Sequence, residues 1–209
     1  MNNSLTTNSQ NDKLFLIFLR ESFFTVEKKK ISIKEISLIA MMAAVITVCS
    51  WLSLPVMTIP VTLQTFAVFL TLLILGGKNG TLSILVYILL GLVGVPVFSG
   101  FKAGPTALFG VTGGYIIGFL LTGIIFFLIT KFVSEKLVVK IISLVIGLIV
   151  CYAFGTAWFI YVYNTGETQI GLISALSMCV FPFIIPDLLK LALATALYKL
   201  LDPVLKKTS

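Results

Sequence analysis

Six long apolar stretches, almost free of charge, dominate this chain of 209 residues. They cover residues 36–53, 61–75, 80–96, 111–132, 139–163 and 169–201. Charged residues make up 11% of the chain, whereas soluble domains carry about 25%. A soluble fold of this size needs far more polar side chains to cover its surface. We therefore expect an all-α polytopic membrane protein, a bundle of six transmembrane helices in a lipid bilayer.

The lengths of the stretches and the positions of the prolines predict where helices end. A bilayer core needs about 20 apolar residues of helix, so the second and third stretches are short and the sixth is too long. Pro182 and Pro186 are expected to break the sixth, so that the final helix begins near Asp187. Residues 54–60 contain two prolines and no charge, which indicates an apolar loop between the first two helices.

The distribution of lysine and arginine predicts the orientation. Counted over alternate connections, thirteen lie on one side of the predicted bundle and one, Lys102, lies on the other. The positive-inside rule then places both termini in the cytoplasm. We expect residues 1–31 to be a cytoplasmic extension and residues 32–205 to form the six-helix domain.

Asp187 and Lys190 lie inside an apolar stretch rather than at its flank, three residues apart. At that spacing they share one face of a helix. An ionisable residue at the centre of a membrane helix costs about 2.5–3.5 kcal/mol, which makes such residues candidates for a functional site. A carboxylate beside an ammonium suits a ligand with a urea-like or amide edge. Alternatively, Asp187 caps the last helix after Pro186 and Lys190 neutralises it.

Further candidates lie toward the outer side of the predicted bundle. Gln64 offers a donor and an acceptor one turn into the second helix, or bridges helices. Phe98 and Lys102 lie in a glycine-containing loop, where Lys102 is either a contact for an anionic substrate or a solvated charge. Thr112 and Tyr115 open the fourth helix in a glycine-rich run that permits close helix packing or close approach of a ligand.

Several functional classes are disfavoured by the sequence. The chain has no histidine, and Cys49, Cys151 and Cys179 have no paired spacing, so we expect no metal site and no cofactor. No phosphate-binding loop or Ser/His/Asp set is present, so neither ATP hydrolysis by the chain itself nor enzymatic catalysis is expected. The net charge of +7 lies at membrane flanks, which favours lipid headgroups over nucleic acid as the partner.

Ala40 and Ala44 form a small-xxx-small pattern on the first helix, with Ala43 beside them. Such a pattern allows another helix to approach closely. The approaching helix belongs either to a partner protein or to the same chain, because alanine is common in membrane helices.

Four ordered motifs resemble the BioY family, the biotin-binding S components of energy-coupling factor (ECF) transporters. They cover about residues 32–202 and read PVTLQT from Pro60, GLVGVPVF from Gly91, TGGY from Thr112, and PFIIPDLLK from Pro182. Two departures concern the outer loop: Val111 stands where the family usually has proline, and residues 97–110 contain no asparagine.

The resemblance implies a function and partners. An S component of the bacterial plasma membrane would capture biotin from outside and work with a T protein and two ABC-type ATPases. Asp187 and Lys190 would bind the ureido ring, the loop after the first helix would cap the pocket, and the segment from Phe98 to Tyr115 would line it. The alanine pattern on the first helix matches the family's docking surface.

Two alternative functions remain open on the sequence. In the first, the chain is an S component for another vitamin such as thiamin or riboflavin. In the second, it carries protons or ions through Asp187 and Lys190. The second alternative is less favoured, because relays usually need several ionisable residues in series and this chain offers one pair.

Overall fold

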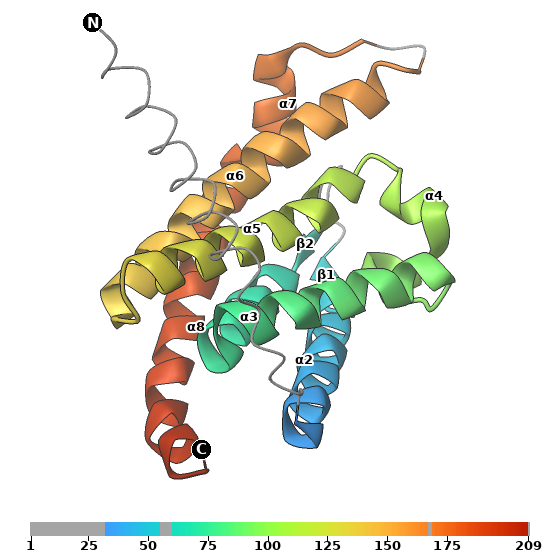
Figure 1. The fold of residues 1–209 in the computed structure, drawn as a ribbon. Helices are drawn as coiled ribbons and strands as arrows, with labels where there is room; N and C mark the ends of the chain where they lie inside the picture. The colour runs from blue at the N-terminus through green and yellow to red at the C-terminus, as the bar shows by residue number, and fades with distance from the viewer. Residues whose placement is uncertain (1–31, 55–59, 167–168, 209) are drawn as a thin grey trace, which may run out of the picture. The chain divides into compact units, whose positions relative to one another are not determined.

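The structure is a computed structural model that describes residues 32–54, 60–166 and 169–208. From Lys34 on, the described residues form one compact unit. The helices are α2 (Ile33–Trp51), α3 (Gln64–Val93), α4 (Gly104–Leu108), α5 (Gly113–Phe132), α6 (Leu137–Tyr163), α7 (Leu172–Cys179) and α8 (Phe181–Thr208), with a short 3-10 helix, η1 (Ser99–Phe101) (Figure 1). The predicted extension, residues 1–31, lies outside the described residues.

The described part of the chain has five helical stretches that are long and apolar enough to cross a bilayer. Four are single helices, and the fifth, Leu172–Pro203, combines α7 with most of α8. This confirms the prediction of an all-α membrane protein with several spans.

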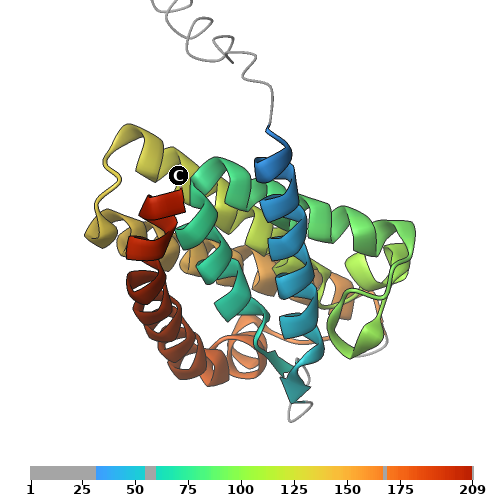
Figure 2. The same ribbon diagram turned by 90° about the horizontal axis from the view of Figure 1, so that it is seen from below.

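The second and third predicted stretches lie in α3, which consists of two helices joined by a sharp corner at Gly76. Gly76 has φ 73° and ψ 179°, and it is the residue of α3 that departs from helical geometry. The residues between the two stretches, 76–80, therefore do not form a separate loop: the helices are joined at the single residue Gly76, because glycine reaches this backbone region and the second helix begins directly after it. Figure 2 shows the teal first part of α3 and its green second part running in different directions.

The final helix begins earlier than predicted. α8 starts at Phe181, and the helical path is broken at Val180, whose φ of −124° and ψ of −58° are not helical. Pro182 is tolerated because N–H groups in the first turn have no helical acceptor. Pro186 lies inside α8 and does not end it. The prediction that the final helix begins near Asp187 is thus wrong by about two turns.

The connection between α2 and α3 contains a small antiparallel hairpin that the sequence did not predict. Strand β1 (Ser53–Leu54) pairs with β2 (Val61–Thr62), with Ser53 opposite Thr62. The predicted apolar loop falls largely on residues 55–59, outside the described residues. The pairing satisfies backbone N–H and C=O groups, which are costly to leave unpaired inside a bilayer.

Glycines bring α5 and α6 close together. A Cβ added at Gly118 would lie 2.6 Å from Cys151 Sγ, and one added at Gly147 would lie 2.6 Å from Thr122 Cγ2. Thr122 Oγ1 donates across this interface to Gly147 O at 2.9 Å. α3 packs against α5 and against α8, so α3, α5, α6 and α8 supply the walls of one site.

Candidate functional site

The described chain contains a pocket to which distant parts of the sequence contribute. Polar side chains such as Gln64, Asp187 and Lys190 line it together with apolar side chains such as Phe119, Leu148 and Phe183. All seven side chains predicted to bind substrate line this pocket: Gln64, Phe98, Lys102, Thr112, Tyr115, Asp187 and Lys190.

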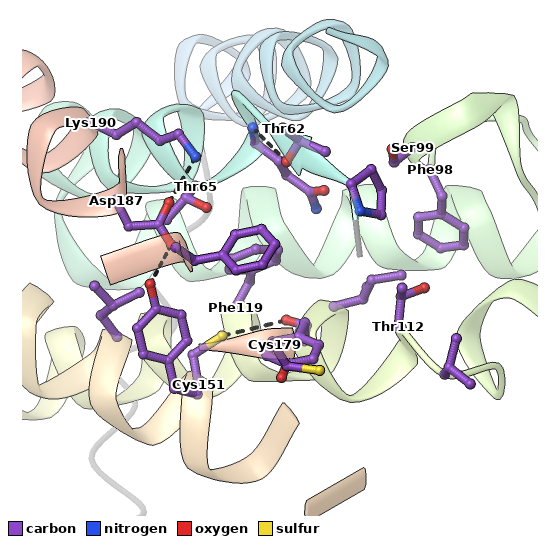
Figure 3. A pocket seen from close by; sticks show the side chains of 18 of the residues that line it. Thr62, Thr65, Phe98, Ser99, Thr112, Phe119, Cys151, Cys179, Asp187 and Lys190 are labelled. Carbon is purple, nitrogen blue, oxygen red and sulfur yellow. Dashed lines mark hydrogen bonds and ion pairs between the residues drawn. The ribbon is translucent and has the colours of Figure 1, made fainter. Parts of the chain in front are cut away.

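Asp187 and Lys190 form a buried ion pair on α8. Lys190 Nζ donates to Asp187 Oδ1 at 2.8 Å (Figure 3), and Asp187 is 3% and Lys190 7% exposed. The other carboxylate oxygen, Oδ2, accepts a hydrogen bond from Tyr152 Oη of α6 at 2.6 Å. Burying either charge alone would cost several kcal/mol, and the pairing offsets much of that cost in an apolar setting.

The cluster retains hydrogen-bonding capacity toward the pocket. A carboxylate offers about four lone-pair sites and an ammonium offers three donors, and the described bonds occupy two of the former and one of the latter. Adjacent acceptor and donor groups therefore face the same cavity. This arrangement fits a neutral ligand edge that carries N–H groups beside a carbonyl.

Gln64 is the first residue of α3 and is 5% exposed. Its Nε2 donates to Tyr87 Oη of the second half of α3 at 3.1 Å, and its backbone N–H donates to Thr62 Oγ1 at 3.2 Å. The bond to Tyr87 fixes the amide at the pocket wall and connects the two halves of α3 across the corner at Gly76.

Phe98 and Lys102 reach the pocket from the connection between α3 and α5. Phe98 is buried, and its ring meets that of Tyr87 edge-on at a centroid distance of 5.6 Å. The ring also fills the space beside Gly91, where a Cβ would collide with it. Lys102 is exposed at the pocket and tied to Phe98, whose N–H donates to Lys102 O at 3.1 Å.

Thr112 and Tyr115 lie at the start of α5. Tyr115 Oη is hydrogen-bonded to Thr156 Oγ1 at 3.0 Å, and its ring lies against Gly155, where a Cβ would collide with it. The neighbouring glycines Gly113 and Gly114 pack closely against Leu108 and Trp158. Close packing of protein groups is therefore why glycine is required at these two positions.

Sequence reasoning missed several residues of the pocket. Ser99, Ala107 and Val111 also line the pocket and lie within the predicted segment from Phe98 to Tyr115, and Pro60 lies in the loop predicted to cap it. The lining residues that were not predicted include Thr62, Thr65, Ile116, Cys151, Tyr152 and Cys179. Of these, Tyr152 matters most because it bonds directly to Asp187. A tyrosine in the middle of an apolar stretch needs a hydrogen-bond partner for its hydroxyl. That requirement was the sequence signal that could have marked Tyr152 as a site residue.

The two alanines predicted to dock a partner lie elsewhere, on the outer face of α2. Ala40 and Ala44 are exposed, whereas Ala43 is 1% exposed and belongs to the core. Neither Ala40 nor Ala44 lines the pocket, so the two groups of predicted residues occupy separate surfaces.

Known proteins resemble this chain over most of its length. A probable biotin transporter BioY from Pyrococcus horikoshii is 38% identical over 77% of this chain and 91% of its own. The biotin transporter BioY from Thermotoga maritima is 40% identical over 72% and 85% of the two chains. In Lactococcus lactis, the biotin transporter BioY2 is 35% identical over 77% and 86%.

A solved structure shares the fold. The S component for biotin from an ECF-type ABC transporter superposes with a TM-score of 0.71 at 27% identity, covering 82% of this chain and 92% of that one. The model of the BioY family matches residues 26–207. This protein therefore belongs to the BioY family.

Proposed function

We propose that this chain is the biotin-binding S component of an ECF transporter, working with a T protein and two ATPase subunits. The observation that carries the proposal is the pocket, which gathers a buried Asp187–Lys190 pair and five other predicted binding residues in a chain of the BioY family. The resemblance to a solved S component for biotin supports it as well.

The pocket chemistry suits the parts of biotin. The ureido ring carries N–H donors beside a carbonyl, which complement the Asp187 carboxylate and the Lys190 ammonium. The bicyclic ring and the aliphatic chain fit the apolar walls formed by Phe119, Leu148 and Phe183. Lys102 is exposed at the pocket, and we assign it to the carboxylate of the ligand.

We further propose six membrane crossings in a bacterial plasma membrane, with both termini in the cytoplasm. A straight helix of the 30 residues of α3 would be about 45 Å long, well beyond the roughly 30 Å of hydrocarbon. A corner at Gly76 lets its two halves cross separately. Residues 32–205 then form the membrane domain and residues 1–31 a cytoplasmic extension.

The exposed alanines of α2 are proposed as the docking surface for the T protein. Ala40 and Ala44 share a face of the helix with Ile36 and Val48, and all four are exposed. Small side chains between larger apolar ones let a second membrane helix approach closely.

Replacement of the ion pair tests the function. Purified Asp187→Asn and Lys190→Ala variants should bind biotin about ten- to a hundredfold more weakly than the wild type, because each loses charge-assisted contacts of about 1.5–3 kcal/mol. Binding is measured by calorimetry in detergent, with thiamin and riboflavin in parallel. Glu135→Gln is the matched control, since Glu135 pairs with Lys140 at 3.0 Å outside the pocket.

The outcomes separate the alternatives. A wild-type protein that binds thiamin or riboflavin in place of biotin would make the chain an S component for that vitamin. Normal biotin binding by both pocket variants would leave the pair with a structural role and overturn its assignment to the ureido ring.

A further inference from the structure

Both tryptophans of the chain donate their indole N–H to the same connection. Trp51, the last residue of α2, donates to Pro96 O at 2.9 Å, and Trp158 of α6 donates to Gly110 O at 3.0 Å. Residues 96–110, here termed the pocket loop, contain Phe98, Ser99, Lys102 and Ala107, all of which line the pocket. The two indoles thus bracket the loop near its two ends.

The pocket loop contains η1 and α4, but its backbone takes an unusual conformation at three positions. Its backbone enters the left-handed region at Gly100 (φ 71°), Phe101 (φ 58°) and Gly104 (φ 79°). A residue with a side chain in this region costs about 1–3 kcal/mol unless its surroundings hold it there. Phe101 is the residue that bears this cost, and its conformation needs support from outside the loop.

Trp51 supplies that support at the first end. The ring of Phe101 stacks on Trp51 with centroids 5.0 Å apart, although Phe101 itself is 64% exposed. The preceding residue of α2, Ser50, donates to Val97 O. The end of α2 therefore contacts the loop through a ring stack and hydrogen bonds to two successive carbonyls.

Trp158 supports the second end of the pocket loop. Its ring lies 6.5 Å from that of Phe109 and packs tightly against Gly114, where a Cβ would collide with it. The indole is therefore held in place by α5 while its N–H reaches Gly110 O. Neither tryptophan lines the pocket.

We propose that Trp51 and Trp158 are positioning residues for ligand binding, which pin the two ends of the pocket loop and thereby hold Phe98 and Lys102 at the pocket. The proposal rests on the proposed function, since biotin is the ligand concerned. Preorganisation of a binding loop raises affinity by removing the cost of ordering it on binding. A released loop opens more often, and the bound ligand then leaves faster.

Trp51→Phe and Trp158→Phe remove the N–H and keep an aromatic ring. In full-length protein in nanodiscs, each should raise the biotin dissociation rate about three- to tenfold, the effect expected of one hydrogen bond. Hydrogen exchange should rise in residues 97–110 and stay unchanged in the buried part of α5.

Phe101→Leu, which removes the stack at an exposed position, should raise exchange in the first half of the loop. Tyr161→Phe on α6, at a side chain 70% exposed, is the matched control and should change neither quantity.

The proposal is overturned if exchange rises equally in α3 and α5, which would give the tryptophans a general structural role. It is also overturned if neither dissociation nor loop exchange changes in the tryptophan variants. A wild-type protein without affinity for biotin would instead refute the proposed function, and the exchange comparison would then decide by itself whether the tryptophans pin the loop.

Discussion

At the scale of single residues, Tyr152 determines how Asp187 is presented. One carboxylate oxygen accepts from Lys190 on the same helix, and the other accepts from Tyr152 on α6. Bonds from two directions fix the plane of the carboxylate. The acceptor sites left for a ligand are thereby aimed at one place in the pocket.

Tyr152→Phe should weaken biotin binding about tenfold, because a hydrogen bond to a charged group contributes about 1.5 kcal/mol or more. The ring remains, so the thermal midpoint should change little. Calorimetric titration measures the affinity. Tyr198→Phe is a matched control, because it removes another tyrosine–aspartate bond, Tyr198 Oη to Asp202 Oδ1 at 3.2 Å, outside the pocket. Equal losses in the two variants would contradict the role given to Tyr152.

The sequence could predict those site residues whose residue type is unusual for the stretch in which they lie. Asp187 and Lys190 stand out because charge is costly inside an apolar stretch. Tyr152 stands out less, because its hydroxyl needs a partner but the sequence does not show which one, and that partner lies 35 residues away on another helix. Contacts of this kind depend on how helices pack, which apolar periodicity does not encode.

At the scale of elements, Gly76 is where α3 changes direction. A φ of 73° with a ψ of 179° belongs to a region that is essentially restricted to glycine. No neighbouring atom would contact an added Cβ, so the requirement for glycine there comes from the backbone alone.

Gly76→Ala should lower the free energy of unfolding by about 1–3 kcal/mol, equivalent to a thermal midpoint lower by roughly 3–10 °C. Gly171→Ala is the matched control: Gly171 has φ −84° and likewise has open space around it. It should leave the midpoint unchanged or raise it slightly. A harmless Gly76→Ala would mean that the corner does not depend on the backbone of glycine.

The sequence predicted where the helical segments lie better than where they end. Apolar stretches placed all the long helices, since burial in lipid requires them. Prolines misled the prediction for α8, because Pro182 falls in the first turn and Pro186 is accommodated inside the helix. The non-helical backbone of Val180, where α7 ends, could not be predicted, because valine as a residue type does not indicate a helix end.

The exposed and the buried face of α2 should differ in how well they tolerate a larger side chain. Ala40→Leu should leave biotin binding and the thermal midpoint unchanged but reduce co-purification with the T protein, because Ala40 is exposed on the proposed docking surface. Ala43→Leu is the comparison within the same turn; Ala43 is 1% exposed, and overpacking there should destabilise the fold by about 1–3 kcal/mol. Undiminished co-purification of Ala40→Leu and Ala44→Leu would remove α2 as the docking surface.

At the scale of the whole molecule, the number of crossings decides on which side each connection lies. If α3 crosses twice, residues 97–110 are outside and residues 131–140 are inside, which agrees with the one lysine in the first segment and the three in the second. If α3 crossed once, the two segments would exchange sides. The corner at Gly76 and the lysine distribution thus lead to the same arrangement.

This arrangement predicts a labelling pattern in intact cells. Cys49, Cys151 and Cys179 are first replaced by alanine, and single cysteines are introduced as Thr106→Cys in α4 or Lys136→Cys between α5 and α6, both at exposed positions. A membrane-impermeant maleimide should label Thr106→Cys directly and Lys136→Cys only after permeabilisation. The reverse pattern would show that α3 crosses once, which would put the pocket loop on the cytoplasmic side. Retained biotin binding in the cysteine-free background is the control that the pocket survives these replacements, because Cys151 and Cys179 line it.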